Sequence, residues 1–280
     1  MSTIQEVAKR AGVSAGTVSR YLNGHQLKAA NQDRVEAAIR DLGYRSNYLA
    51  RSLRSNRSMS IGLLINNMLN HFAVSVVAQV ERQMELNDYN IILSGFRKEQ
   101  DIFVHKLANL IDRRVDGLIL FEPIEDDRAR KLIEQSGIPT LSISNPLPYA
   151  CVDNMLASAR KSCRKVTRRM IDMGHTRIGI LAASQEEYVS RERLAGVLEA
   201  FDDAGLPRNK AVVRIGDYSR ECGYRDMMHL LNEDHVDCVF ALNYGRGQGA
   251  QQALSELGLR IGQDVSFACY DYLDTQTYFH

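Results

Sequence analysis

The sequence lacks the features that mark secreted, membrane and metal-binding proteins. Its five cysteines form no CxxC pair and no spacing typical of a metal site, so we expect reduced thiols and no bound metal. The chain does not open with a basic stretch followed by an apolar run, and its longest apolar segments are only about as long as a strand. We therefore expect neither secretion nor membrane insertion, and a cytoplasmic location.

Motifs of catalysis and of nucleotide binding are missing as well. The chain contains no GxGxxG or GxxxxGK[ST] phosphate loop, no GxSxG elbow and no HExxH sequence. Its seven histidines are scattered along the chain. The sequence thus predicts no enzyme and no cofactor.

The charge is unevenly distributed along the chain. The whole sequence has a net charge of +1, but residues 1–58 hold ten lysines and arginines against four acidic residues, and the remainder holds 25 against 30. A basic head on an acidic body is typical of a polyanion-binding module joined to a different kind of domain. Chance scatter of solvated charge is the alternative.

The first forty residues carry the signals of three short helices. Thr3 and Glu6 have the spacing of a capping box, and Gly12 would end the helix that follows. Ser14 would cap a second helix, and residues 31–42 have the apolar spacing of a third. Two helices joined by a three-residue link that contains glycine indicate a helix-turn-helix.

The residues of this segment, TIQEVAKRAGVSAGTVSRYLNG, closely resemble the DNA-binding head of the lac-repressor (LacI/GalR) family. The resemblance implies that the helix at residues 14–23 enters the major groove of DNA. The small residues at positions 15 and 16 depart from better-known members, so specificity is expected to depend more on other positions. The alternative role of Thr3 and Ser14 is helix capping, and that of Asn23 is to end a helix. The implied DNA-contact residues are Thr3, Ser14, Ala15, Gly16, Thr17, Ser19, Arg20 and Asn23.

The segment at residues 47–58, NYLARSLRSNRS, is basic and has too few apolar positions for an independent core helix. It resembles the family's hinge helix, which folds on operator DNA and inserts a leucine into the minor groove. The resemblance implies DNA contacts from Ala50, Arg51 and Leu53. A flexible linker with an incidental leucine is the alternative.

From residue 61 onwards, short apolar runs alternate with helical periodicity. Such alternation indicates a parallel α/β fold, and the number of units exceeds one comfortable sheet, so we expect two subdomains with a ligand cleft at the carboxyl ends of their strands. The expected strands lie at 61–65, 90–94, 116–121, 139–144, 177–181, 211–215, 237–242 and 264–270, with helices at 72–86, up to 111, 156–173, 193–204, near 224 and after 242.

The pieces VDGLILF, CVDN, GHTRIGIL and RERLAG resemble the family's effector domain, which is related to periplasmic sugar-binding proteins. The resemblance runs from residue 3 to about residue 272. It implies a helix-turn-helix domain at 1–45, a hinge or linker at 46–58, and an effector-binding and dimerisation domain at 59–280. Because resembling members extend well beyond His280, we expect this last domain to be C-terminally incomplete.

Carried across by the resemblance, an arginine and an acidic partner would hold the effector, and an aromatic residue would stack on its ring. Such a site suits a sugar, a sugar phosphate or a nucleoside. Ordinary packing is the alternative for the aromatic residues, and a structural salt bridge for the arginine and its partner. Tyr244 stands where the family usually has an aspartate and could reshape the pocket. The implied effector residues are Phe72, Asp153, Arg191, Arg193, Tyr218, Asn243 and Asp271.

One helix, at residues 156–173, has basic residues spaced by four along one face. We interpret them as a solvated helix face, and a second nucleic-acid patch is the alternative. The residues are Arg160, Lys161, Arg164, Lys165, Arg168 and Arg169.

Together these features predict a sequence-specific transcription regulator, a repressor by the family default, that binds a pseudo-palindromic operator as a homodimer and responds to a small-molecule effector such as a carbohydrate. Two alternatives stay open. The first is a small-molecule-binding protein without DNA regulation. The second is a truncated fragment that no longer senses its ligand.

Overall fold

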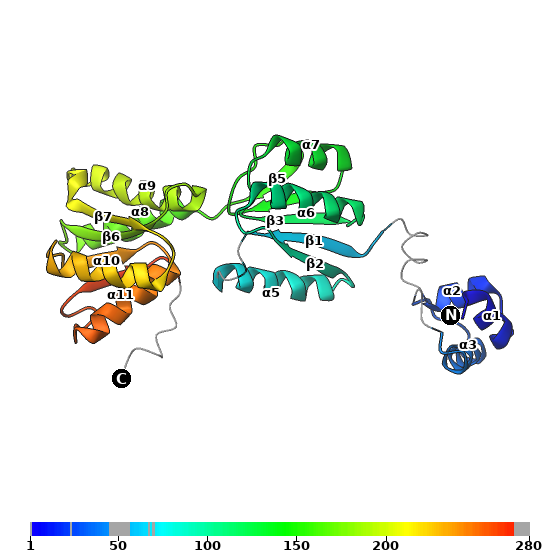
Figure 1. Cartoon of the computed structure of the whole chain (residues 1–280). Helices are drawn as coiled ribbons and strands as arrows, with labels where there is room; N and C mark the ends of the chain where they lie inside the picture. Colours follow the sequence, from blue (N-terminus) through cyan, green and yellow to red (C-terminus); the bar gives the residue numbers. More distant parts are fainter. Residues whose placement is uncertain (1, 23, 45–56, 67, 69–70, 272–280) are drawn as a thin grey trace.

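The computed structural model describes residues 2–22, 24–44, 57–66, 68 and 71–271. They form a small helical head and two α/β lobes (Figure 1). We call residues 60–155 the N-lobe and residues 159–271 the C-lobe. No helix in the described ranges is long and apolar enough to cross a membrane.

The head consists of α1 (Ile4–Ala11), α2 (Ala15–Leu22) and α3 (Ala29–Asp41). The predicted capping box is confirmed, because Glu6 N donates to Thr3 Oγ1 and Thr3 N donates to a Glu6 carboxylate oxygen at 2.7 Å. Gly12 ends α1 in the left-handed region, with φ of 63°. The third helix starts two residues earlier than predicted, since its two alanines favour helix. The head's core contains Val7, Val18 and Val35.

The N-lobe holds a five-stranded parallel sheet in the order β2-β1-β3-β4-β5. Helix α5 lies on one face of this sheet, and α6 and α7 lie on the other (Figure 1). The central strands are apolar on both faces, which explains this arrangement, since each sheet face has its own buried set. The elements are β1 (Ser60–Ile65), α5 (His71–Glu85), β2 (Asn90–Gly95), α6 (Gln100–Asp112), β3 (Gly117–Phe121), α7 (Asp127–Ser136), β4 (Thr140–Ile143) and β5 (Val152–Met155).

The C-lobe repeats this architecture with a four-stranded parallel sheet in the order β7-β6-β8-β9. Helices α8 and α9 pack on one face, and α10 and α11 on the other. The elements are α8 (Ala159–Asp172), β6 (Ile178–Ala183), α9 (Tyr188–Asp203), the 3-10 turn η1 (Arg208–Lys210), β7 (Ala211–Gly216), α10 (Arg220–Asn232), β8 (Cys238–Ala241), α11 (Tyr244–Glu256) and β9 (Ser266–Cys269).

The predicted fold class, a helix-turn-helix head with two parallel-sheet subdomains, is confirmed. Sequence periodicity missed two elements, α7 and β5. In α7 only Ala129 and Ile133 are buried among many charged residues, and in β5 only Val152 is buried. Helix α9 starts at Tyr188 rather than at residue 193, so Arg193 lies on its second turn.

The basic face of α8 joins this helix to α9. Arg160 pairs with Glu192 at 2.6 Å and with Glu199 at 3.2 Å, and Arg164 pairs with Asp203 at 2.5 Å. These contacts support the interpretation of the basic residues as an ordinary helix surface rather than as a second nucleic-acid patch.

Candidate functional site

Helix α2 of the head begins with a side-chain cap. The backbone nitrogen of Thr17 donates to Ser14 Oγ at 3.1 Å, and the two hydroxyls lie 2.9 Å apart. Ser14 therefore has the capping role that its sequence position suggested, as Thr3 has on α1. Val18 holds the inner side of α2 in the core. The outer side carries the other candidate DNA contacts, of which the first three are exposed and the last two half-buried: Ala15, Gly16, Arg20, Thr17 and Ser19.

Four further candidate DNA contacts lie outside the described residues. They are Asn23 at the end of α2 and the hinge residues Ala50, Arg51 and Leu53.

A cavity of about 710 Å³ lies between the two lobes. Most of its polar lining follows the carboxyl ends of parallel strands, where ligands of α/β proteins bind. The N-lobe contributes Asn66, Phe72, Lys98, Glu122 and Ser144, and the C-lobe contributes Glu187, Val189, Arg193, Tyr218, Ser219, Arg220, Asn243, Tyr244, Gly245, Gln248 and Asp271.

Arg193 is held at the cavity wall by contacts on several sides. Its Nη1 donates to the carbonyl of Leu242 and lies 3.8 Å from the Asp271 carboxylate. Its guanidinium also stacks on Tyr270, 3.8 Å from the ring centroid. Within the described part of the chain, Arg193 Nε is buried and has no hydrogen-bond partner. This nitrogen is a donor that a ligand could satisfy.

Asn243 supplies a second donor of the same kind. It caps α11, because its Oδ1 accepts a hydrogen bond from Arg246 N at 3.0 Å. Its Nδ2 is buried and finds no partner among the described residues. Asp271 lies next to it and accepts from Tyr244 N at 3.0 Å. An unpaired buried donor costs about 1–3 kcal/mol, which makes Arg193 and Asn243 candidates for hydrogen bonds to acceptor oxygens of a ligand.

Both lobes contribute aromatic residues to the cavity lining, Phe72 from the N-lobe and Tyr218 and Tyr244 from the C-lobe. Phe72 is 53% exposed, and its ring centroid lies 6.1 Å from that of Phe121. Tyr218 donates to the Glu187 carboxylate, and its hydroxyl lies 2.7 Å from Ser190 Oγ. Burial and the bond to Glu187 raise the pKa of Tyr218 well above its usual value.

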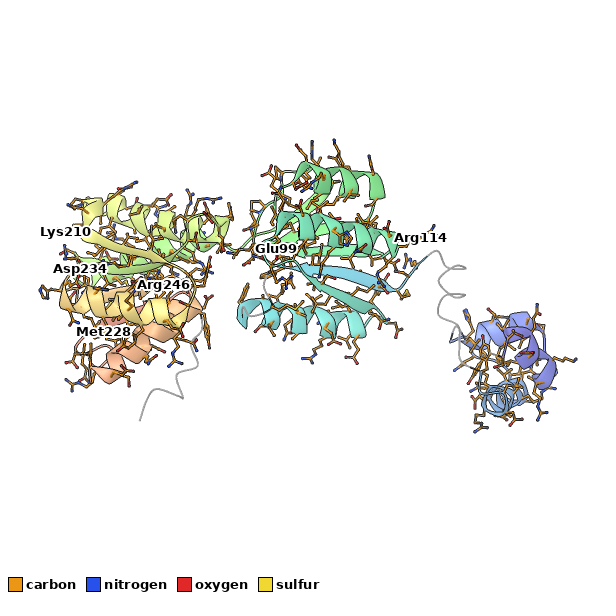
Figure 2. All side chains as sticks on the ribbon, in the orientation of Figure 1. Glu99, Arg114, Lys210, Met228, Asp234 and Arg246 are labelled. Atoms are coloured by element: carbon orange, nitrogen blue, oxygen red, sulfur yellow. The ribbon has the colours of Figure 1, made fainter. Side chains whose placement is uncertain are left out.

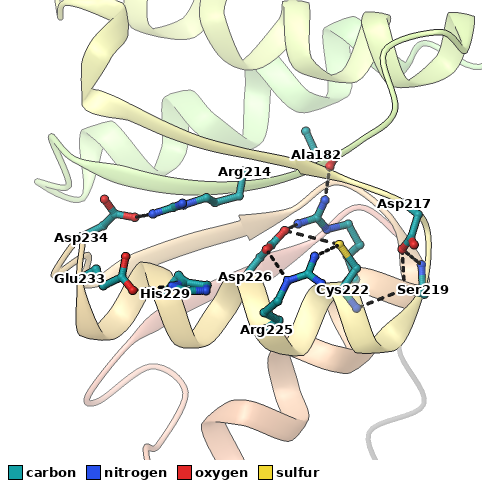
Figure 3. A network of polar contacts seen from close by, with 11 residues as sticks. Ala182, Arg214, Asp217, Ser219, Cys222, Arg225, Asp226, His229, Glu233 and Asp234 are labelled. Atoms are coloured by element: carbon teal, nitrogen blue, oxygen red, sulfur yellow. Dashed lines mark hydrogen bonds and ion pairs between the residues drawn. The ribbon is translucent and has the colours of Figure 1, made fainter.

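Below the cavity, a buried arginine fastens the start of α11. Arg246 is fully buried, donates to the carbonyl of Ala182 at the end of β6, and pairs with Asp226 on α10 (Figure 3). Figure 2 shows Arg246 inside the C-lobe. Because Asn243 caps the helix that carries Arg246, this ion pair also holds Asn243 in position at the cavity.

Two predicted effector residues lie outside the cavity lining, so the structure does not bring them together with the other five. Asp153 is the second residue of edge strand β5, pairs with Leu141 and is exposed, so it is not at a strand's carboxyl end. Ser144, after β4, lines the cavity instead. Arg191 turns away from the cavity, as expected two positions from Arg193 on a helix. Its Nη1 donates to the carbonyls of Gln185 at 3.1 Å and of the next residue at 2.7 Å.

Sequence analysis missed four charged cavity residues, Lys98, Glu122, Glu187 and Arg220. Glu122 directly follows β3, so its position at a strand end could have indicated it. Lys98, a few residues after β2, carries the same signal more weakly. Glu187 precedes α9 and carries no such signal.

Two family models together match nearly the whole chain. The model of bacterial regulatory proteins of the lacI family matches residues 3–47. The model of periplasmic binding proteins and the sugar-binding domain of the LacI family matches residues 58–279. The chain belongs to the LacI family. The predicted family is thereby confirmed.

Curated relatives and solved structures agree with this assignment. The HTH-type transcriptional repressor PurR of Proteus mirabilis is 33% identical over 283 residues, which cover 100% of this chain and 83% of the relative. PurR of Photobacterium profundum is 30% identical over 286 residues, covering 100% and 84%. These relatives are transcriptional repressors rather than enzymes.

Among solved structures, the lac repressor dimer bound to operator and the anti-inducer ONPF is similar with a TM-score of 0.83 at 27% identity, covering 99% of this chain and 84% of that one. The complex of the transcriptional regulator CelR with cellobiose gives 0.65 at 28% identity, covering 95% and 82%. This LacI-family chain is a DNA-binding transcriptional repressor controlled by a small-molecule effector, as predicted.

Proposed function

We propose that this LacI-family repressor binds a pseudo-palindromic operator as a homodimer and that the cavity between its lobes is the effector site. In this proposal residues 1–45 form the DNA-binding head, residues 46–58 the hinge, and residues 59–280 the part that binds effector and dimerises. The operator-bound dimer of the lac repressor supports the first half. One helix reads too few base pairs for genomic selectivity, and a two-fold dimer doubles the contact.

The observation that carries the effector site is the pair of buried, unpartnered donors, Arg193 Nε and Asn243 Nδ2, in one cavity wall. Both can donate hydrogen bonds to acceptor oxygens of a ligand, and Asp271 beside them can accept hydrogen bonds from hydroxyls. Phe72 and Tyr218 add aromatic faces suited to a ring. A sugar or a nucleoside carries the matching groups.

The effector would act on DNA binding through the relation between the lobes. Because both lobes line the cavity, a ligand that contacts both stabilises one arrangement of them over others. The hinge connects the head to the N-lobe, so a change in the arrangement of the lobes reaches the DNA-binding helices. In this role the protein binds and releases ligands in the cytoplasm and catalyses no reaction.

Fluorescence anisotropy tests the DNA half. A palindrome selected from random duplexes should bind with a Kd of about 10⁻⁸ M or tighter at about 0.15 M salt, whereas scrambled DNA should bind at least about a thousandfold more weakly. Replacing the exposed Arg20 by alanine should weaken selective binding. Equal affinity for both duplexes would contradict the proposal.

Two arginines on one helix test the effector half. The variant Arg193→Ala should lose the thermal shift that any responding sugar or nucleoside of a screening panel produces, because the donor at the cavity wall is gone. Arg191→Ala is the matched control, since its side chain lies outside the cavity. Equal shifts in both variants would remove Arg193 from the site.

A further inference from the structure

A lysine from the N-lobe reaches into the cavity and pairs with a carboxylate of the C-lobe. Lys98, after β2, forms an ion pair with Glu187, the residue that precedes α9. The Lys98 ammonium also lies 5.9 Å from the centroid of the Tyr218 ring. The lysine side chain is 58% exposed and the Glu187 side chain is 18% exposed. The ammonium therefore sits at the solvent side of a largely buried anion.

A second carboxylate stands nearby in the N-lobe wall. Glu122 accepts a hydrogen bond from Asn66 Nδ2 at 3.2 Å, and the Oδ1 of the same asparagine accepts from the backbone nitrogen of Lys98 at 2.8 Å. Burial and the proximity of Glu187 raise the pKa of Glu122. The carboxyl groups of Glu122 and Glu187 thus both stand near the single ammonium of Lys98.

These groups have the composition of a site for a primary ammonium. Carboxylates bind ammonium by charge-assisted hydrogen bonds, and an aromatic face within about 6 Å adds a cation–π attraction. The hydroxyl of Tyr218 is held by Glu187 and Ser190, so the ring has a fixed position. The ammonium of Lys98 occupies this site at the end of a flexible, exposed side chain, and a ligand could displace it from the site.

The rest of the cavity requires a different group from the same ligand. Arg193 Nε and Asn243 Nδ2, each buried without a partner among the described residues, call for acceptor oxygens. A ligand that spans the cavity would therefore carry hydroxyl or carbonyl oxygens for the C-lobe wall and a cation for the carboxylates. A phosphate at the carboxylates would instead meet like charge.

We propose that Glu187, Glu122 and the face of Tyr218 form an ammonium subsite, occupied in the free protein by Lys98, and that the effector is a hydroxylated primary amine, such as an amino sugar, whose ammonium takes the place of the lysine's. The inference rests on the proposed role of the cavity as the effector site. Displacement of Lys98 breaks an ion pair between the lobes, which couples ligand entry to their arrangement.

Propylammonium chloride probes the subsite without knowledge of the effector. In the full-length variant Lys98→Met, which removes the resident cation, ligand-observed NMR titration should show saturable binding about tenfold tighter than in the wild type, the factor expected from an exposed ion pair plus a cation–π contact. Propanol and propionate should not bind. The control variant Lys131→Met, at an exposed position on α7, should match the wild type.

The double variant Lys98→Met/Glu187→Gln should lose most of the propylammonium binding. The proposal is overturned if Lys98→Met shows no saturable binding, if propanol binds equally well, or if Glu187→Gln makes no difference. Thermal unfolding of each variant verifies that the fold is kept. Operator selectivity and the Arg193→Ala comparison are measured separately, so an absent ammonium subsite is distinguishable from a cavity that binds no effector.

Discussion

The two lobes share one architecture but differ in what they bury. The sheet cores of the N-lobe are built from apolar side chains such as Leu64, Phe103 and Leu118. The C-lobe adds an ion pair between the fully buried Arg246 and the largely buried Asp226. The same lobe also carries both unpartnered donors of the cavity. The C-lobe thus places buried polar groups beneath and around the ligand, whereas the N-lobe is a mainly apolar body with charged residues at its strand ends.

The two lobes also differ in how closely their elements pack. A Cβ atom added to Gly249 would lie 1.9 Å from the carbonyl oxygen of Arg220, and one added to Gly196 would lie 2.1 Å from that of Arg160. Both C-lobe helix pairs therefore approach backbone to backbone. In the N-lobe, a Cβ on Gly62 would meet only side-chain atoms of Leu110 and Leu118. The C-lobe is the more tightly constrained platform, as suits fixed donors aimed at a ligand.

The largest expected effect comes from breaking the buried ion pair. Arg246→Ala leaves the largely buried Asp226 with only the exposed Arg225, 3.5 Å away, and should destabilise the C-lobe by about 3–5 kcal/mol. Replacing both partners, as in Arg246→Met/Asp226→Leu, should restore most of this loss because no unpaired charge remains. Hydrogen exchange read by mass spectrometry reports the two lobes separately. An Arg246→Ala variant as protected as the wild type would show that the pair contributes little.

The double variant also sharpens the functional side of the comparison. If the ion pair positions the loop that carries Asn243, the stable double variant should still lose affinity for a responding ligand, with unchanged operator binding in the absence of ligand. Retained affinity would limit Arg246 to a structural role.

In the N-lobe, the matching change is Leu118→Ala. The side chain is 1% exposed and lies in the core between β3 and the helices, so its truncation leaves a cavity and should cost about 3 kcal/mol. Loss of exchange protection should be confined to N-lobe peptides. Equal loss in both lobes would mean that they unfold as one unit and that the comparison does not extend to stability.

The sequence was sufficient to predict the strand–helix alternation and, through the family resemblance, five residues of the cavity lining. Phe72, Arg193, Tyr218, Asn243 and Asp271 do meet in one cavity. The Lys98–Glu187 contact could not be predicted, because it depends on how two lobes face each other across 89 positions of sequence. Nor could the buried position of Arg246, since an arginine after a strand usually signals exposed surface.

The smallest expected effect is a pH dependence from the N-lobe wall. Burial and Glu187 raise the pKa of Glu122, and Lys98 and Arg193 oppose this shift more weakly. The folded protein therefore binds this proton more tightly than the unfolded chain does. The stability that the group contributes is fully present below the ordinary glutamate value of about 4.3 and is lost as pH rises through the raised pKa of the folded state.

Glu122→Gln keeps the neutral form at all pH values, so its unfolding free energy should decline less between pH 4 and 8 than that of the wild type. The control Glu125→Gln changes a neighbouring exposed carboxylate and should leave the slope unaltered. Urea unfolding at several pH values measures the difference. Parallel curves for the wild type and Glu122→Gln would mean that the pKa of Glu122 is the same in the folded and unfolded states, and that burial in the N-lobe wall does not set this carboxyl group apart from the exposed Glu125.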